Sequence, residues 1–220
     1  MKFETFLIIC NYVGTVAFAA SGALKGIKHN LDIFGITLLA ILTACGGGIL
    51  RDILVNQIPD ALVNPEALYI AVISSGIICV FMNKIKKRIK ISWQKKIKLY
   101  RLVIISNLIF DSVGLAAFTL IGANKSISMG LNIVTTATLA VLTGVGGGIV
   151  RDLLVTEIPI VLKEDIYAVL AFGGGIVYHI FVIKFKFLRI PTMIVLFIII
   201  LVIRLIVIKY KINLPKTKIE

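Results

Sequence analysis

The chain has 220 residues, of which 59% are hydrophobic and 16% are charged, and its formal net charge is +13. An ordinary soluble domain is about 45–50% apolar and about 25% charged, and a chain of this length has too much surface to hide such an apolar excess. The composition excludes a soluble globular domain and predicts a membrane protein that crosses the bilayer several times. Because the basic residues lie between apolar spans, the positive charge indicates orientation in the membrane and not nucleic-acid binding.

Seven apolar stretches are long enough to be membrane-spanning helices, since a span needs about 20 mostly apolar residues. Helices are expected because backbone groups in lipid must be satisfied internally. In chain order the predicted spans cover residues 5–24, 33–55, 66–83, 101–122, 132–155, 165–183 and 190–208. The predicted fold class is therefore an all-α integral membrane protein.

The sequence repeats itself at an offset of one hundred residues. Residues 46–52 read GGGILRD and residues 146–152 read GGGIVRD. Around these motifs, roughly half of residues 11–62 are identical to residues 111–162 without a gap. Internal repeats of this kind indicate a fold built from two similar units.

The charge pattern predicts which side of the membrane each loop occupies. Residues 84–101 carry nine Lys or Arg and no acid, so this segment is expected in the cytoplasm, with the N-terminus outside and the C-terminus inside. The three basic residues of segment 184–189 argue against this orientation for the last span. Because each repeat holds an odd number of spans, the second copy must enter from the opposite side, and this makes the repeat inverted. In transporters with inverted repeats, the pathway lies at the repeat interface.

We expect five segments from this reasoning. They are repeat 1 with helices 1–3 (1–83), a basic cytoplasmic linker (84–100), repeat 2 with helices 4–6 (101–183), a peripheral seventh helix (190–208) and a cytoplasmic tail (209–220).

Each triple glycine lies in the second half of its span. Three successive glycines weaken a helix by about 1 kcal/mol each relative to alanine, which predicts a kink or an unwound turn whose carbonyls replace part of an ion's hydration shell. The residues expected to line the resulting constriction are Gly46, Gly47, Gly48, Gly146, Gly147, Gly148, Thr43 and Thr143. The alternative is close helix packing, which small residues allow in membranes.

Charged residues inside spans are functional hypotheses by default. The charged residues expected along the pathway are Arg51, Asp52, Arg151, Asp152, Asp111, Lys25 and Lys125. Arg51 is expected near the outer mouth and Arg151 near the inner one, and neighbours on a helix point about 100° apart, so an Arg–Asp pair need not bond internally. The alternatives are arginines that reach lipid headgroups beside exposed aspartates, lysines that anchor helix ends, and a helix–helix hydrogen bond for Asp111, whose repeat partner is Asn11.

The remaining chemistry-bearing residues indicate neither an enzyme nor a metal site. The three cysteines lie inside apolar spans without metal-ligand spacing, and no nucleophile, base and acid stand together. We therefore expect no catalytic residue, no metal and no cofactor.

Two copies of GGGxxRD, each in the second span of a three-span repeat and each with Ile-Pro beginning seven residues after the Arg, resemble the bacterial UPF0126 proteins. This family is also called the glycine transporter domain family and is similar to trimeric intracellular cation (TRIC) channels. The resemblance covers about residues 5–208. It implies a seven-helix protein of the bacterial inner membrane that forms a homotrimer, with one pore in each protomer, bent second and fifth helices, and passage of monovalent cations such as potassium.

Regulation is not carried over from the resemblance. Animal members have a Lys-Glu-Val lipid-binding motif in the second helix, and the sequence contains no such tripeptide.

The function expected from the sequence is a transmembrane channel for monovalent, potassium-like cations. The positive charges of Arg51 and Arg151 do not favour cations unless Asp52, Asp152 or carbonyl dipoles offset them. The first alternative is a secondary transporter for glycine or another small zwitterion, whose carboxylate and ammonium could use an Arg and an Asp. The second is a non-conducting structural or sensor protein.

Overall fold

The structure is a computed structural model that describes residues 2–88, 93–163 and 166–212. Over these residues it is helical without strands. The elements are α1 (Phe3–Lys28), α2 (Ile33–Leu54), α3 (Asp60–Val63), α4 (Glu66–Arg88), α5 (Trp93–Ser128), α6 (Ile133–Leu154), α7 (Ile160–Lys163), α8 (Ala168–His179), the π-helix η1 (Ile180–Lys184) that continues α8, and α9 (Arg189–Tyr210).

The predicted spans correspond to long helical segments. Within the described parts of the chain, six helices are long and apolar enough to cross a membrane, and α8 with η1 forms a shorter apolar segment, 168–184. The largest difference between a predicted span and the observed helix is at α5, which the sequence predicts over 101–122 and which runs from Trp93 to Ser128. Hydropathy identifies only the apolar part of a helix, whereas lysine has a high helix propensity and allows the helix to continue beyond that part. Parts of three predicted segments, residues 89–92, 164–165 and 213–220, lie outside the described residues.

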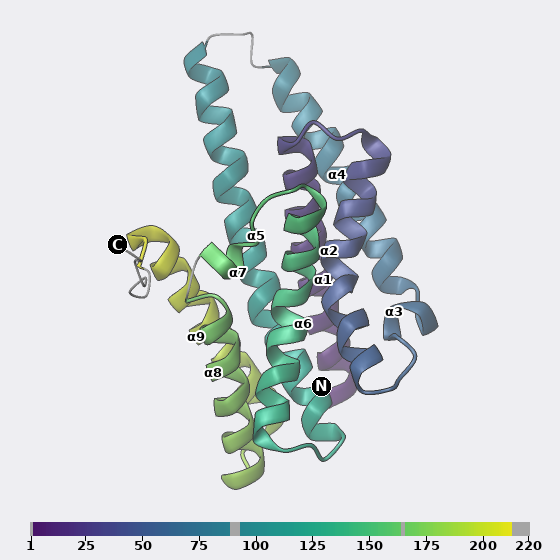
Figure 1. Cartoon of the computed structure of the whole chain (residues 1–220), viewed down its shortest axis with the longest axis vertical. Helices are drawn as coiled ribbons and strands as arrows, with labels where there is room; N and C mark the ends of the chain where they lie inside the picture. The colour runs from purple at the N-terminus through teal and green to yellow at the C-terminus, as the bar shows by residue number, and fades with distance from the viewer. Residues whose placement is uncertain (1, 89–92, 164–165, 213–220) are drawn as a thin grey trace, which may run out of the picture.

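The helices form a bundle of two inverted halves. Figure 1 shows α1 starting at the lower end, whereas α5, its repeat counterpart, starts at the upper end and runs down. The starts of α1 and α5 therefore lie at opposite ends of the bundle, as an odd number of crossings requires. Helix α9 lies at one side of the bundle and packs on α5 and α8. The predicted fold class is confirmed.

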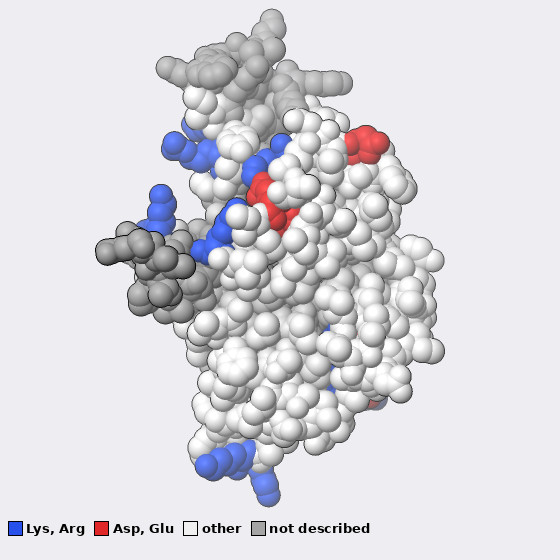
Figure 2. All heavy atoms as spheres, viewed as in Figure 1, with Lys and Arg blue, Asp and Glu red and all other residues white. Residues whose placement is uncertain are grey.

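The surface in Figure 2 fits a membrane environment. A broad band of this face is nearly free of charged side chains, and the Lys and Arg side chains gather towards the two ends. Large apolar side chains such as Ile73, Ile77 and Leu154 are more than half exposed. Lipid tails solvate these side chains without the cost that water would impose.

The inverted halves meet at symmetric aromatic contacts. The rings of Phe18 and Phe118 have centroids 5.2 Å apart. Gly14 and Gly114 lie against the opposite rings, and a Cβ on Gly114 would overlap Phe18. The pseudo-two-fold axis therefore passes between α1 and α5.

The predicted unwound turn at the triple glycines is wrong. The α-helix continues through Gly46–Gly48 and through Gly146–Gly148. The glycines instead let α2 and α6 cross closely: a Cβ on Gly47 would overlap the Thr143 carbonyl oxygen, and one on Gly147 would overlap that of Thr43. Close backbone packing of this kind offsets the weak helix propensity of glycine. A bend that keeps the helical hydrogen bonds stays a prediction.

Candidate functional site

The Arg-Asp motif forms the same internal ion pair in both repeats. Arg51 donates from Nε and Nη2 to the two carboxylate oxygens of Asp52 at 2.7 and 2.9 Å. Arg151 donates from Nε to Asp152 Oδ1 at 2.9 Å. Although Cβ atoms of neighbouring residues diverge, the long arginine side chain curls back to its own neighbour. Each pair is thus neutral as a unit.

The same aspartates fix the turn that follows each helix. Asp52 Oδ2 accepts the backbone N–H of Asp60, and Asp152 Oδ2 accepts that of Ile160, both at 3.0 Å. Between them, Asn56 and Thr156 occupy left-handed backbone conformations with φ of 55° and 56°. These contacts explain why the motif spans both the Arg-Asp pair and the later Ile-Pro, which precedes α3 and α7.

The arginines are not headgroup anchors. Arg51 is 4% exposed and Arg151 is fully buried, and their aspartates are no more than 1% exposed. The alternative of snorkelling arginines beside exposed aspartates is therefore wrong. Charges buried this deeply are stable only when paired, and the pairing answers the question of how the positive charge is offset.

A cavity of about 660 Å³ lies in the half of the bundle that holds the start of α1 and the helix α3. It reaches inward to Thr15, Gly48 and Thr143. Its charged lining residues are Glu4, Arg51, Asp52, Asp60, Glu66, Lys125 and Arg189.

Asp60 is the acid that links the cations of this cavity. Its Oδ2 lies 3.1 Å from Arg51 Nη2 and 3.6 Å from Lys125 Nζ. Glu66 accepts a hydrogen bond from the Tyr12 hydroxyl. The cavity consequently holds cations and carboxylates side by side, among apolar lining residues such as Leu7, Phe118 and Ile121.

In the second repeat, the residues equivalent to Arg51 and Asp52 belong to a buried charge cluster, defined by Arg151, Asp111, Asp152, Lys25 and, at its partly exposed edge, Glu157. Arg151 Nη1 lies 2.6 Å from Asp111 Oδ1. Lys25 Nζ lies 3.0 Å from Asp152 Oδ1 and 2.9 Å from Glu157 Oε2. Ser21 of α1 joins by accepting a 2.6 Å hydrogen bond from Arg151 Nη1. The cluster therefore ties α1 of the first repeat to α5 and α6 of the second.

The predicted site residues divide between these two regions and the helix crossing. The cavity of about 660 Å³ brings together Gly48, Arg51, Asp52, Lys125 and Thr143, and the buried charge cluster holds Lys25, Asp111, Arg151 and Asp152. At the crossing lie Thr43, whose hydroxyl bonds the Leu39 carbonyl, and the glycines other than Gly48 and Gly148. Gly148 lies beside Tyr167, Asp111 and Arg151. A role in lining a pore stays a prediction for all of these residues.

Sequence reasoning missed the acids that differ between the two copies. Asp60 stands where the second copy has Ile160, and Glu157 stands where the first has Gln57. A search for identical positions passes over such pairs, whereas a search for charge changes between the copies would have found them.

Glu157 binds three cationic or polar groups at the end of α1. Its carboxylate lies 2.9 Å from Lys25 Nζ, 2.7 Å from Lys28 Nζ and 2.7 Å from His29 Nε2. Partial burial acts to raise the pKa of Glu157, but the hydrogen bonds from Lys28, Lys25 and His29 outweigh it and hold the pKa below its usual value. Glu157 thus stabilises the contact between the two repeats as a carboxylate.

Replacing Glu157 with Gln should lower the free energy of unfolding by about 1 kcal/mol, which lowers the melting temperature by roughly 2–4 °C. Because the native pKa is depressed, the stabilisation is complete above the unfolded-state pKa of about 4.3 and is lost only as pH falls through the lower native value. Melting curves in detergent should therefore show a difference that does not shrink between about pH 7 and pH 5. A difference that vanishes by about pH 5 would contradict the pairing.

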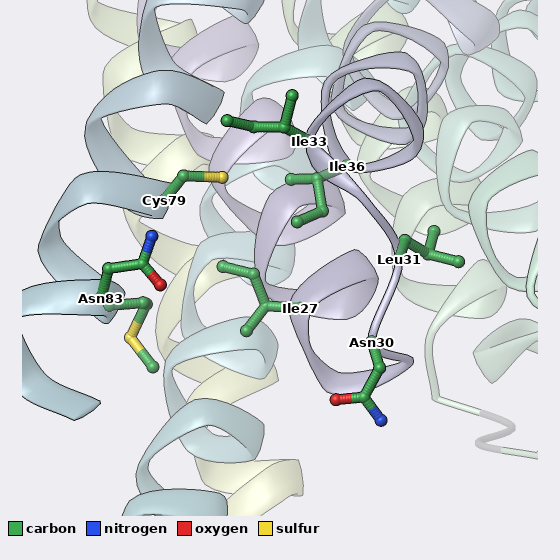
Figure 3. A pocket seen from close by; sticks show the side chains of 8 residues that line it. Ile27, Asn30, Leu31, Ile33, Ile36, Cys79 and Asn83 are labelled. Atoms are coloured by element: carbon green, nitrogen blue, oxygen red, sulfur yellow. The ribbon is translucent and has the colours of Figure 1, made fainter. Parts of the chain in front are cut away.

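A second cavity of about 330 Å³ lies apart from these charges, between the α1–α2 turn and α4. Figure 3 shows Cys79 and Asn83 of α4 opposite Ile27 and Ile36. Its lining residues are uncharged, so it does not belong to the charged site.

The inverted repeats, the close crossing of α2 and α6, and the buried Arg-Asp pairs define a polytopic membrane protein with duplicated architecture. The chain belongs to the UPF0126 family: the family model described as "Glycine transporter" matches residues 8–84 and 108–182, one block in each repeat. It is 35% identical to the UPF0126 inner membrane protein YadS of Escherichia coli strain K12 over 208 residues, 92% of each chain. It is 38% identical to the UPF0126 membrane protein YvgT of Bacillus subtilis strain 168 over 170 residues, 77% of each chain.

Solved structures of TRIC channels share the fold. A prokaryotic TRIC channel crystallised in 0.5 M KCl has a TM-score of 0.83 and 33% identity, covering 96% of this chain and 100% of that chain. A TRIC cation channel studied for the structural basis of its conductance has a TM-score of 0.81 and 32% identity, covering 100% of this chain and 99% of the other. The predicted resemblance is confirmed.

Proposed function

We propose that this protein is a membrane channel for monovalent cations, potassium among them, with a pathway inside each protomer between the two repeats. The observation that carries the proposal is the cavity of about 660 Å³, with seven charged residues in its lining, that ends at Gly48 and Thr143 beside the crossing of α2 and α6. The similarity to TRIC cation channels over nearly the whole chain supports it.

The charges of the cavity favour cations. Four carboxylates line it, those of Glu4, Asp52, Asp60 and Glu66, against three cationic side chains, so the lining has a small negative excess. Because Arg51 is paired with two of these carboxylates, it does not act as an isolated positive charge. In a narrow site of low dielectric, such a balance has a far larger effect than in water.

The buried cluster is the second half of the proposed pathway. Ion pairs between Arg151, Asp111, Asp152 and Lys25 lie at the position equivalent to the cavity of about 660 Å³, which is the outer cavity in the proposed orientation. Conduction therefore requires these pairs to separate or to exchange partners, and the conformation described here is a closed one.

A carrier for glycine or another small zwitterion is the second candidate. The description of the matching family model favours it, and Arg51 beside Asp60 offers groups for a carboxylate and an ammonium. The two candidates differ in kinetics, since a carrier saturates and a channel does not.

Flux from proteoliposomes loaded with KCl distinguishes the candidates. In vesicles without valinomycin, and with a protonophore that balances the charge, a channel releases potassium down its gradient at a rate that does not depend on glycine. Uptake of labelled glycine that saturates, in vesicles that retain their potassium, would replace the channel by the carrier.

The cellular setting extends the proposal. We place the protein in the bacterial inner membrane as a homotrimer, with repeat 1 over 1–83, the linker over 84–100, repeat 2 over 101–183, helix 7 over 190–208 and the tail over 209–220. The support for the membrane is the similarity to an inner membrane protein of Escherichia coli, and the support for the trimer is the similarity to TRIC channels.

The N-terminus should lie outside and the C-terminus in the cytoplasm, because residues 84–101 carry nine Lys or Arg and no acid. A phosphatase reporter, active only in the periplasm, should be inactive after residue 220 and active when inserted after Asn64. The opposite pattern would reverse the assignment of outer cavity and inner cluster.

A further inference from the structure

Helix α9, the last membrane-spanning helix, carries a buried arginine, Arg204, that has no counterpart in the repeat. Only 33% of the most apolar window of α9 is buried, and Ile203 and Leu205 are each more than a third exposed, yet Arg204 between them is fully buried. A charged side chain near a helix end in a membrane usually reaches the interface. Arg204 points into the bundle instead, which marks it as a residue with an internal role.

The guanidinium of Arg204 lies on the face of Tyr167, with Cζ 4.7 Å from the ring centroid. Tyr167 is 1% exposed and stands just before α8. A cation on an aromatic face is attracted by the ring, and the attraction is stronger when both partners are desolvated. This contact therefore fixes the plane of the Tyr167 ring.

The other end of Tyr167 reaches the buried charge cluster. Around the point where a Cβ on Gly148 would stand, the Tyr167 hydroxyl lies at 3.3 Å, Asp111 Oδ1 at 3.7 Å and Arg151 Nη2 at 3.8 Å. The hydroxyl thus shares a small space with the Arg151–Asp111 ion pair, and Gly148 leaves that space open.

The first repeat has no equivalent of this arrangement. Ala67 stands where the second repeat has Tyr167, and α9 has no repeat counterpart. Around Gly48, the Arg51 guanidinium is the one neighbour within 4 Å of the Cβ position among the residues described. The arrangement of Arg204 and Tyr167 beside an arginine–aspartate pair is therefore confined to the half of the molecule that contains Arg151.

We propose that Arg204 is a positioning residue that holds the Arg151–Asp111 pair in place through the Tyr167 ring. By this contact it couples α9 to the inner half of the pathway. The electrical consequence rests on the proposed channel function. The structural consequence, an energetic coupling between Arg204 and Asp111 that passes through Tyr167, does not.

Current–voltage curves test the electrical consequence. Arg204→Met removes the charge and the planar face, Arg204→Lys keeps the charge alone, and Tyr167→Phe keeps the ring and removes the hydroxyl. Lys209→Met is the matched control, because Lys209 is an exposed cation on the same helix that lies 5.3 Å from the Tyr210 ring centroid.

Arg204→Met should change the ratio of currents at opposite voltages by about twofold or more, with Lys209→Met unchanged. Arg204→Lys should resemble Arg204→Met, because the planar contact is lost. Combining Arg204→Met with Tyr167→Phe should add nothing to the larger single effect. Rectification that is unchanged in Arg204→Met, or effects that simply multiply in the double variant, would overturn the proposal.

Melting temperatures in detergent test the coupling without any ion flow. Arg204→Met and Asp111→Asn should depart from additivity by roughly 2–4 °C when Tyr167 is present, and should be additive in a Tyr167→Leu background. Additivity in both backgrounds would overturn the coupling even if the wild-type protein conducts. If the wild-type protein carries no current, the channel function fails and the melting cycle decides this inference alone.

Discussion

Replacing Gly47 with leucine should reduce ion flux at least about tenfold, because the new side chain forces α2 away from α6. Even a Cβ at this position would overlap the Thr143 carbonyl oxygen, and backbone does not move aside cheaply. Inserting larger groups at tight contacts costs about 1–3 kcal/mol and sometimes more. Flux from proteoliposomes, normalised to the amount of folded protein, measures the effect.

The same glycine run supplies the control. A Cβ on Gly46 would meet Gly147 Cα and Val150 Cγ2 at 3.7 Å, an ordinary contact. Gly46→Ala should therefore keep flux near the wild-type level and should strengthen the helix by up to about 1 kcal/mol. Gly173→Leu, with nothing within 4 Å of its Cβ position among the residues described, controls for added bulk. Equal flux from Gly47→Leu and Gly46→Ala would remove the helix crossing from the pathway.

Neutralising the two arginines should produce rectification of opposite sign. Inversion of the repeat puts Arg51 and Arg151 towards opposite sides of the membrane. With the proposed orientation, Arg51→Gln should alter current chiefly for ions entering from outside, and Arg151→Gln chiefly for ions entering from inside. Current–voltage curves in symmetric KCl compare the two variants directly. Identical, unrectified curves would contradict the assignment of the two arginines to opposite mouths.

The two variants should also differ in stability. Arg151→Gln leaves the buried Asp111 without its partner, and removing one member of a buried ion pair costs about 3–5 kcal/mol. Arg51→Gln also leaves a buried carboxylate, that of Asp52, without its cation, but the side chain of Asp60, the other partner of Arg51, is 62% exposed. Both acidic partners of Arg151 are buried, so Arg51→Gln should cost less. Asp111→Asn, which restores the residue found at Asn11 in the first repeat, should recover most of the stability of Arg151→Gln. No recovery would mean that Arg151 is held mainly by Asp152.

The arrangement of helices follows from the sequence because hydropathy and the repeat depend on local pattern. Span length predicted most helices within about five residues at each end, whereas α5 is longer than predicted at both ends. The odd number of spans in each copy predicted the inversion. The predicted unwound turn at the glycine runs was wrong because helix propensity describes an isolated helix. In the bundle, the lack of side chains at these glycines lets α2 and α6 pack closely, and this packing stabilises both helices.

The site could be predicted only in part, because its contacts join distant residues. Lys25 and Glu157 are 132 residues apart in sequence, and no local pattern pairs them. The burial of Arg204 could not be predicted, since composition cannot tell which face of α9 packs inward. Its contact with Tyr167 is visible only once α8 and α9 are placed against α5.

The most direct test of the channel proposal is the reversal potential of purified protein in a planar bilayer with a tenfold KCl gradient and no glycine. A cation channel should give discrete current steps that reverse close to the potassium equilibrium potential, about 59 mV from zero for a perfectly selective pore. Steps that reverse near the chloride potential, or no steps from protein that takes up glycine saturably in vesicles, would contradict the account.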